Sequence, residues 1–182
     1  KVCSNANWKK KTRRLHGWNN KNTNRVSASI KLGENIMAIT SAICNSFKVE
    51  ILKAVHNFTA SSGNTFNLAL YTSSATLNKS TTAYTTSNEI TNSSGSAYSA
   101  KGKPLTSVTP VLSTDTAVCD FSDVSWTSAT FTANGCLIFN DSASGDPAVC
   151  AIAFGSDKTV TSGTFTIQFP TADASNAIIR IA

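Results

Sequence analysis

The chain has 182 residues, of which 41% are hydrophobic, 8% aromatic and 14% charged, and its formal net charge is +6. This length suits one domain with its own core, and the composition excludes a disordered polyelectrolyte, a coiled coil and a helical membrane protein. Residues 1–36 hold nine of the sixteen basic residues and one acidic residue, so residues 37–182 carry a net charge of −2. A folded body without net positive charge does not favour a nucleic-acid partner.

Residues 1–36 differ from the rest because Asn and Lys dominate and no apolar periodicity persists. The run Lys9–Arg14, with Trp8 and Trp18 nearby, is typical of a basic arm that stacks on nucleic acid. A different interpretation rests on codons, because Leu32-Gly33-Glu34 can be encoded by a bacterial ribosome-binding sequence and Met37 follows at short spacing. We favour the second interpretation and predict a basic upstream leader over 1–36 and a single domain over 37–182.

The first predicted element is an amphipathic helix of about four turns over 41–57, with Ser41 as its N-cap. Its apolar arc contains Ile43, Phe47, Ile51, Ala54, Val55 and Phe58. Its polar arc contains Asn45, Ser46, Glu50, Lys53, His56 and Asn57. Such a helix is expected to pack on a sheet or on a neighbouring subunit.

Short runs rich in β-formers follow the helix and are separated by turn residues. They cover 65–72, 105–111, 116–121, 129–139, 148–154, 164–169 and 177–181. Within 164–169, Phe165, Ile167 and Phe169 alternate with polar residues, which indicates one buried and one wet face. The predicted fold is mainly β: an antiparallel β-sandwich, jelly-roll-like or Ig-like, with one N-terminal amphipathic helix. The aromatic residues expected in its core are Trp126, Phe131, Phe139, Phe154, Phe165 and Phe169.

A segment rich in Ser, Thr and Asn lies between Thr72 and Gly102. Its composition alone fits a disordered linker. The isolated apolar residues Tyr84, Ile90 and Tyr98 favour a long surface loop that is held at a few points. Long ordered loops often carry binding sites.

The sequence predicts no catalytic, cofactor or metal site. His56 is the only histidine after Met37, and its place on the polar arc indicates a solvated surface residue. The run 141–146 superficially resembles a calcium loop, but Ala143 stands where an oxygen ligand is required and no closing Glu follows. We interpret this run as a hairpin turn.

The five cysteines are Cys3, Cys44, Cys119, Cys136 and Cys150, and no Cys-x-x-Cys pair occurs. The last three lie among apolar residues of predicted strands. This pattern favours small, reduced, buried hydrophobic residues over a disulfide framework or a zinc site.

Five stretches, taken in order, resemble a family of small structural proteins of tailed bacteriophages. They are Phe66–Ala75, Thr82–Glu89, Asp120–Trp126, Thr164–Pro170 and Ala177–Ile181. The resemblance covers about 37–182, and it implies a virion component without enzymatic activity, made in the bacterial cytoplasm and located either on the head or on the tail. The chain departs from the family pattern between Gly95 and Pro104, where Ser96, Ser99, Lys101 and Lys103 replace a more glycine-rich turn.

The function that we predict is capsid decoration by multivalent protein–protein contacts, with copies of this chain and other virion proteins as partners. The expected contact residues are Phe47, Ile51 and Val55 of the helix, and Tyr84 and Tyr98 of the loop 78–103. An alternative is a tail-associated module that binds a receptor or a cell-surface glycan. An exposed Tyr84–Tyr98 pair would favour glycan binding because sugars stack on aromatic rings, whereas a buried pair would favour decoration. A third alternative, a hydrolase, requires His56 to meet an acid and a nucleophile in one pocket.

Overall fold

The computed structural model describes residues 38–91 and 95–182, which belong to one compact unit, Asn35–Ala182. In this part of the chain the fold is mainly β, with antiparallel sheets and one short helix. The mainly β class and the antiparallel pairing were therefore predicted correctly. The predicted leader, its Lys9–Arg14 run and Cys3 lie outside the described residues.

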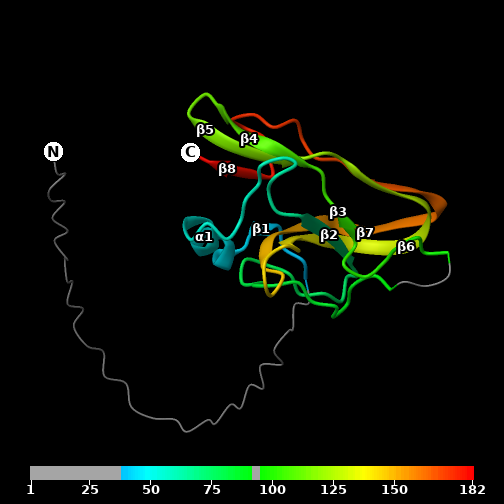
Figure 1. The fold of residues 1–182 in the computed structure, drawn as a ribbon. Helices are drawn as coiled ribbons and strands as arrows, with labels where there is room; N and C mark the ends of the chain where they lie inside the picture. The colour runs from blue at the N-terminus through cyan, green and yellow to red at the C-terminus, as the bar shows by residue number, and fades with distance from the viewer. Residues whose placement is uncertain (1–37, 92–94) are drawn as a thin grey trace, which may run out of the picture. The chain divides into compact units, whose positions relative to one another are not determined.

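Eight strands and one helix follow one another along the described chain (Figure 1). They are β1 (Ala42–Ile43), α1 (Asn45–Leu52), β2 (Phe66–Tyr71), β3 (Lys103–Pro104), β4 (Ser107–Ser113), β5 (Thr116–Phe121), β6 (Val124–Asn140), β7 (Ala148–Ile167) and β8 (Ile179–Ile181). Strand pairing forms a five-stranded sheet of order β1-β7-β6-β2-β3 and a three-stranded sheet of order β4-β5-β8.

The two longest strands of the larger sheet, β6 and β7, form a hairpin. It begins beside the turn at Phe139↔Ala148 and extends to Val124↔Ile167, with several register shifts between. The sequence predicted two separate strands, 148–154 and 164–169, where the structure has the continuous β7 ending at Ile167. The polar residues between these runs also pair with β6, for example at Thr132↔Thr159, so the strand is not interrupted.

The side chains of β2 and of the last part of β7 differ in burial because the faces of these strands are covered to different extents. All six residues of β2 are buried because this strand lies between β6 and β3 in the larger sheet and is covered on both faces. In the last part of β7 the predicted alternation is confirmed, since Phe165 and Ile167 are half-buried while Thr164 and Thr166 are exposed. The larger sheet is therefore covered at its centre and partly open along β7.

The two sheets meet through aromatic rings. The ring of Phe66 in β2 stacks on Phe58 with centroids 4.3 Å apart, and it lies 5.6 Å from the ring of Phe121 in β5. In Figure 1 the β4-β5-β8 sheet lies above the larger sheet in this view. Aromatic pairs at such distances contribute about 0.5–1.5 kcal/mol beyond the area they bury.

The predicted four-turn helix over 41–57 is wrong in its extent, because α1 has only eight residues. Its predicted N-cap, Ser41, precedes β1 instead and accepts a hydrogen bond from the backbone N–H of Ala153 (2.9 Å). The helix ends because Ala54 adopts a left-handed conformation with a φ of 56°, where the chain turns back. The residues after Leu52 therefore form a loop in which His56 and Phe58 are buried.

Of the aromatic residues predicted to be core, Trp126, Phe131 and Phe139 are buried. Phe154, Phe165 and Phe169 are only half-buried, which corrects the prediction for these three. They line a groove on the open side of β7.

The prediction for the cysteines is confirmed for the four that the structure describes, which are all buried and free. Burial raises the pKa of the Cys44 thiol to about 11 and the pKa values of Cys119 and Cys150 to about 12, and it also raises that of Cys136. High pKa values disfavour the thiolate, so these thiols behave as packing groups rather than as nucleophiles.

Candidate interaction surface

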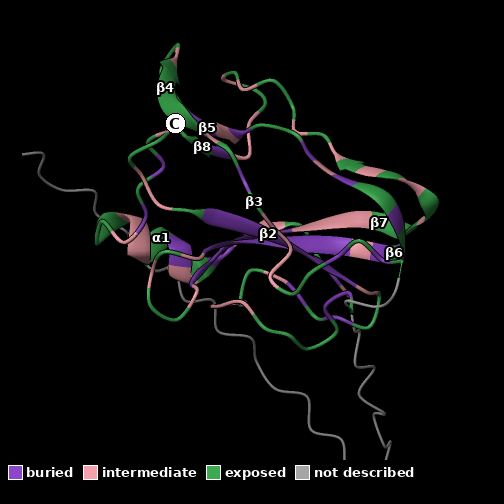
Figure 2. Ribbon diagram, turned by 45° about the vertical axis from the view of Figure 1, so that its right-hand side comes forward, coloured by how far each residue is buried: buried purple, intermediate pink, exposed green. Residues whose placement is uncertain are grey.

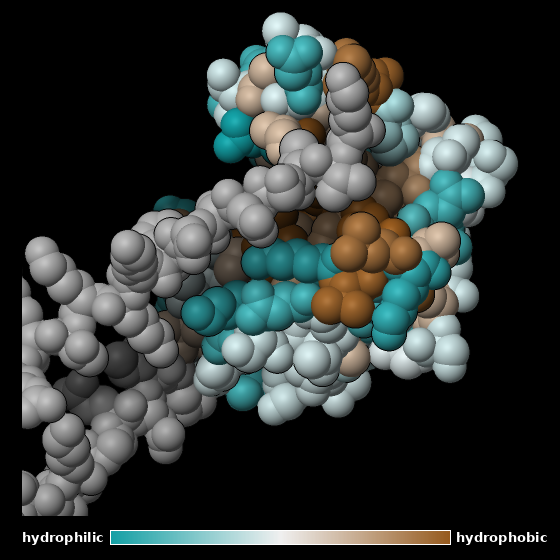
Figure 3. Space-filling model, turned by 90° about the vertical axis from the view of Figure 1, so that its left-hand side faces the viewer, coloured by the Kyte–Doolittle hydropathy of each residue, from teal (hydrophilic) through white to brown (hydrophobic). Residues whose placement is uncertain are grey.

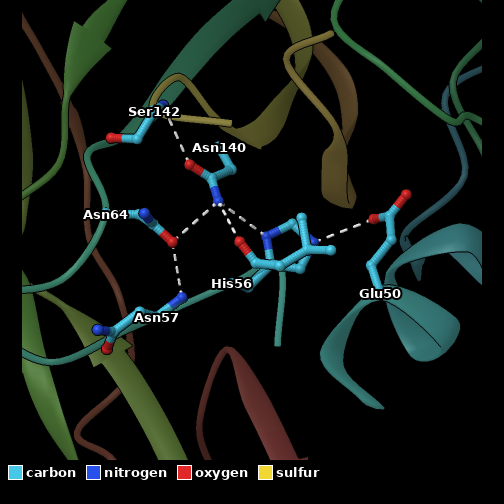
Figure 4. A network of polar contacts seen from close by, with 7 residues as sticks. Glu50, His56, Asn57, Asn64, Asn140 and Ser142 are labelled. Atoms are coloured by element: carbon cyan, nitrogen blue, oxygen red, sulfur yellow. Dashed lines mark hydrogen bonds and ion pairs between the residues drawn. The ribbon is translucent and has the colours of Figure 1, made fainter. Parts of the chain in front are cut away.

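A buried histidine lies at the centre of a polar network between α1 and the end of β6 (Figure 4). The Nε2 atom of His56 is 3.0 Å from Oε2 of Glu50, and its Nδ1 atom is 3.1 Å from Nδ2 of Asn140. The amide of Asn140 is oriented by the N–H of Ser142, which donates to Oδ1 (3.0 Å). Nδ2 of Asn140 therefore donates to Nδ1 of His56, and Nε2 carries the proton that faces Glu50.

The same amide group of Asn140 also holds the loop that follows α1. Its Nδ2 atom also lies 3.3 Å from the carbonyl oxygen of Val55 and 3.1 Å from Oδ1 of Asn64, so its two N–H bonds are shared among three acceptors. Asn64 Oδ1 in turn accepts the N–H of Asn57 (2.7 Å). Asn140 is completely buried, and its contact with His56 is buried as well, whereas its hydrogen bonds to Val55 and Asn64 are partly buried.

His56 was predicted to be a solvated surface residue, and this prediction is wrong because only 7% of its surface is exposed. The chain reversal at Ala54 breaks the helical periodicity on which the prediction depended, and the imidazole turns inward against Phe47, with ring centroids 4.9 Å apart. Both ring nitrogens already have protein partners. Through these two contacts the network holds the loop that follows α1.

A second network holds the long loop between β2 and β3. The carboxylate of Glu89 is buried and accepts the hydroxyls of Tyr84 (2.5 Å) and Tyr98 (2.7 Å). It also accepts the backbone N–H of Lys101 (2.8 Å). The Tyr98 hydroxyl in turn accepts the N–H of Leu70 in β2 (2.9 Å). The loop is thereby tied to the centre of the larger sheet.

Lys101 ties the same loop to the turn between β6 and β7. Its Nζ atom lies 2.7 Å from Oδ1 of Asp141 and 2.9 Å from Oδ2 of Asp146, and these hydrogen bonds raise the pKa of the ammonium group. The predicted hairpin turn at 141–146 is confirmed, and its two carboxylates serve this ion pair. Lys101 is therefore a charged anchor of the loop.

The two tyrosines predicted as contact residues do not form an exposed pair. Tyr98 is 1% exposed and belongs to the core, which corrects its prediction as a contact residue. Tyr84 is half-buried, and its ring stacks on Phe139 with centroids 4.7 Å apart. Their rings are occupied by protein neighbours, so they do not offer a platform on which a sugar could stack.

The buried hydroxyls and thiols predict a loss of stability at alkaline pH. Desolvation, with the hydrogen bond to Glu89, raises the pKa of Tyr84 from 10.0 to about 12, and the pKa of Tyr98 is also raised. In the unfolded chain the tyrosine hydroxyls and the thiols have their ordinary pKa values. As the pH rises, these groups therefore lose their protons at a lower pH in the unfolded chain than in the folded one. The contribution of these groups to the free energy of unfolding is therefore fully present below about pH 8 and is lost as the pH rises to about 12.

Urea unfolding followed by tryptophan fluorescence at a series of alkaline pH values measures this fall. The Tyr84→Phe variant is the matched control, because it keeps the ring and loses the titrating hydroxyl. Its free energy of unfolding should fall less steeply between about pH 10 and 12 than that of the wild type. A midpoint that stays constant through this range in the wild type would contradict the prediction.

Large apolar side chains are exposed on the face that carries α1 and the smaller sheet. We call this set the apolar face; it consists of Val49, Leu52, Val108, Val111, Leu112 and Ile181. Leu52 is 87% exposed and Leu112 is 71% exposed. Figure 3 shows apolar side chains gathered on this side of the molecule. An apolar hollow of about 80 Å³, lined by Ile51, Pro110 and Ile181 among others, lies between the helix and the sheet and joins the two parts of the face.

The three contact residues predicted in and after α1, which are Phe47, Ile51 and Val55, differ in how far they are buried. Phe47 is 3% exposed and packs in the core, so its prediction as a contact residue is wrong. Ile51 and Val55 are half-buried, and Ile51 lines the hollow of the apolar face. The residues that α1 exposes are Val49 and Leu52, which the sequence analysis missed. Val49 is an apolar residue outside the apolar arc of the predicted helix. This break in the amphipathic pattern could have indicated that Val49 is exposed.

Among the residues 38–91 and 95–182, no three His, Cys, Asp or Glu side chains are grouped so that they could hold a metal ion. In the same ranges, helices long and apolar enough to cross a membrane are absent. Comparisons of the chain with models of protein families, with curated proteins and with solved structures found no match.

Proposed function

We propose that this chain is a non-enzymatic structural component of a tailed bacteriophage particle and that it decorates the capsid through multivalent protein–protein contacts. In this proposal the two antiparallel sheets form a β-sandwich of jelly-roll or Ig type. The protein is made in the bacterial cytoplasm and resides in the virion. The resemblance of five ordered stretches between Phe66 and Ile181 to small phage structural proteins supports this assignment.

The observation that carries the proposal is the apolar face. Single exposed apolar residues are common on protein surfaces, whereas a group of six on α1 and the smaller sheet, beside an apolar hollow that Ile181 lines, marks a contact surface. α1 and the smaller sheet present this group on packed elements, so little conformational freedom is lost when a partner binds. Repetition over a capsid lattice would turn many such modest contacts into strong retention.

Two rigid networks fit the same role. Asn140 holds the loop after α1, and Glu89 holds Tyr98 and Lys101 of the long loop beside the larger sheet. A protein that binds many copies of the same partner surface loses less conformational entropy in each contact when its loops are already held in place. The buried position of Tyr98 does not favour the alternative of a tail-associated module that binds a receptor or glycan through the tyrosine pair.

The hydrolase alternative lacks support at His56. The imidazole meets an acid, Glu50, but its second nitrogen is occupied by the amide of Asn140. The alternative required a nucleophile at that position. A role in folding explains both contacts of His56.

The Leu52→Asp variant tests the contact surface. Leu52 is exposed in the free protein, so the variant should fold normally, but binding to the capsid would bury the new carboxylate. We expect at least about tenfold weaker binding to particles that lack the protein, measured by cosedimentation. Thr127→Asp adds the same charge at an exposed residue of β6 and should bind like the wild type. Equal binding of both variants and the wild type would contradict the assignment of this face.

A further inference from the structure

An open apolar groove lies on the side of β7 that faces away from β6. Its volume is 780 Å³, and its apolar lining comes from Ile43, Ile152, Phe154, Phe165, Ile167 and Phe169. These side chains belong to β1, to both halves of β7 and to the segment after β7. A groove of this size accommodates several apolar side chains of a partner.

The groove follows an open strand edge. Within the described residues, β1 pairs with β7 only at Cys150 and Ala151, and β6 occupies the opposite edge of β7. Beyond the hydrogen bond from Ala153 to Ser41, the same edge of β7 continues for more than ten residues without a neighbouring strand in the described sheet. Such an edge presents backbone N–H and C=O groups that can pair with an added strand.

The same chain carries an apolar strand that needs a partner. β4 is the outer strand of the smaller sheet, and five of its seven residues are exposed. Figure 2 shows β4 as an exposed, projecting element above the body of the molecule. Val108, Val111 and Leu112 are its large exposed side chains. We call the hairpin of β4 and β5 the arm.

The arm and the groove have complementary charge. Lys158 is the one charged residue in the lining of the groove, and its side chain is held by a hydrogen bond to Ser156 (3.0 Å) on the exposed surface. The arm, residues 107–121, contains Asp115 and Asp120 and no basic residue. Asp115 is exposed in the turn at the tip of the arm, three residues after Leu112. An arm lying in the groove can therefore bring a carboxylate to the lysine.

We propose that the arm of one copy docks on the β7 edge of a second copy, with Leu112 in the groove and Asp115 paired with Lys158. The backbone of β4 adds to the open edge of β7, and the apolar side chains of both copies leave water. This contact is heterologous because arm and groove are different surfaces, so each copy gives one arm and accepts another. Closed rings or open chains result, depending on the rotation between copies.

Charge reversal tests the contact in the full chain. Sedimentation velocity over a range of concentrations should show self-association of the wild type and its loss, by at least about tenfold in the association constant, in Lys158→Glu and in Asp115→Lys. The double variant Asp115→Lys/Lys158→Glu restores the pair with opposite polarity and should regain association. Lys79→Glu, which changes an exposed lysine outside arm and groove, is the control and should associate like the wild type.

A mixing experiment tests the head-to-tail geometry. Leu112→Asp disables the arm and leaves the groove intact, while Lys158→Glu disables the groove and leaves the arm intact. Each variant should be monomeric alone, and an equimolar mixture should give a one-to-one dimer that does not grow. A wild type that stays monomeric at all concentrations, association that both charge reversals leave unchanged, or a mixture that stays monomeric would each overturn the proposal. This inference does not rest on the phage role, since Leu52→Asp should leave self-association unchanged.

Discussion

Replacing Gly102 by alanine is expected to lower the free energy of unfolding by more than about 4 kcal/mol. Gly102 has a φ of +66°, which side chains of L-residues rarely adopt. A Cβ atom at this position would also overlap the carbonyl oxygen of Leu68 in β2 and would come within 2.9 Å of Cα of Ala69. Neither neighbour can move alone, because both belong to the buried centre of the larger sheet.

The substitution would also disturb the neighbours of Gly102 in the loop, because Gly102 directly precedes β3. Lys103 and Pro104 pair with Leu68 and Asn67, so displacement of Gly102 removes this short strand from the sheet. It would also shift Lys101, whose N–H contacts Glu89 and whose ammonium group contacts Asp141. The long loop would then lose its second attachment to the sheet.

Gly145→Ala is a control that has the strained backbone conformation of Gly102→Ala but not its steric overlap with β2. Gly145 has a φ of +84°, but nothing lies within 4 Å of the position of its Cβ. This variant should lose only the cost of a left-handed alanine, about 1–2 kcal/mol. Urea unfolding of both variants and of the wild type measures the difference. Equal losses at the two glycines would show that the approach of Gly102 to β2 is not as close as described.

The second large effect is expected for Asn140→Leu, which keeps the approximate volume of the side chain and removes its polar atoms. The substitution would leave the N–H of Ser142, Nδ1 of His56, Oδ1 of Asn64 and the carbonyl of Val55 without this partner. Each buried polar group left unpaired costs about 1–3 kcal/mol. We expect a total loss of about 4 kcal/mol or more in the free energy of unfolding.

Asn134→Leu is the matched control on the same strand. The amide of Asn134 makes one exposed hydrogen bond, to Oδ1 of Asp157 (2.8 Å). Its loss should cost about 1 kcal/mol or less. Thermal and urea unfolding of both variants would measure the two losses, and a change of less than about 1 kcal/mol at Asn140 would refute the role of its amide in holding the loop.

Local pattern was sufficient for much of the β-structure. The alternation of Phe165 and Ile167 with threonines marks the two faces of β7 because side chains of a strand point to opposite sides in turn. The same pattern could not show that β7 is continuous, since Thr159 and its neighbours are held in the sheet by pairing with distant residues of β6. Pairing partners are not encoded in the residues of one strand.

The polar networks were less accessible to prediction. His56 and Asn140 are 84 positions apart, and each alone has the appearance of a surface residue. The end of α1 at Leu52 depends on a left-handed turn at Ala54, a residue type that otherwise favours helices. The anchor at Lys101 likewise depends on two carboxylates about 40 residues further along the chain. Periodicity does not carry such long-range information.

We propose that this protein is a repeated part of a virion, and its copy number in purified phage particles from its source tests this proposal most directly. Quantitative mass spectrometry would compare its peptides with those of the major capsid protein in the same particles. Decoration predicts a copy number close to that of the capsid protein. A few copies per particle would contradict decoration and indicate the tail, and absence from well-covered particles would contradict a structural role altogether.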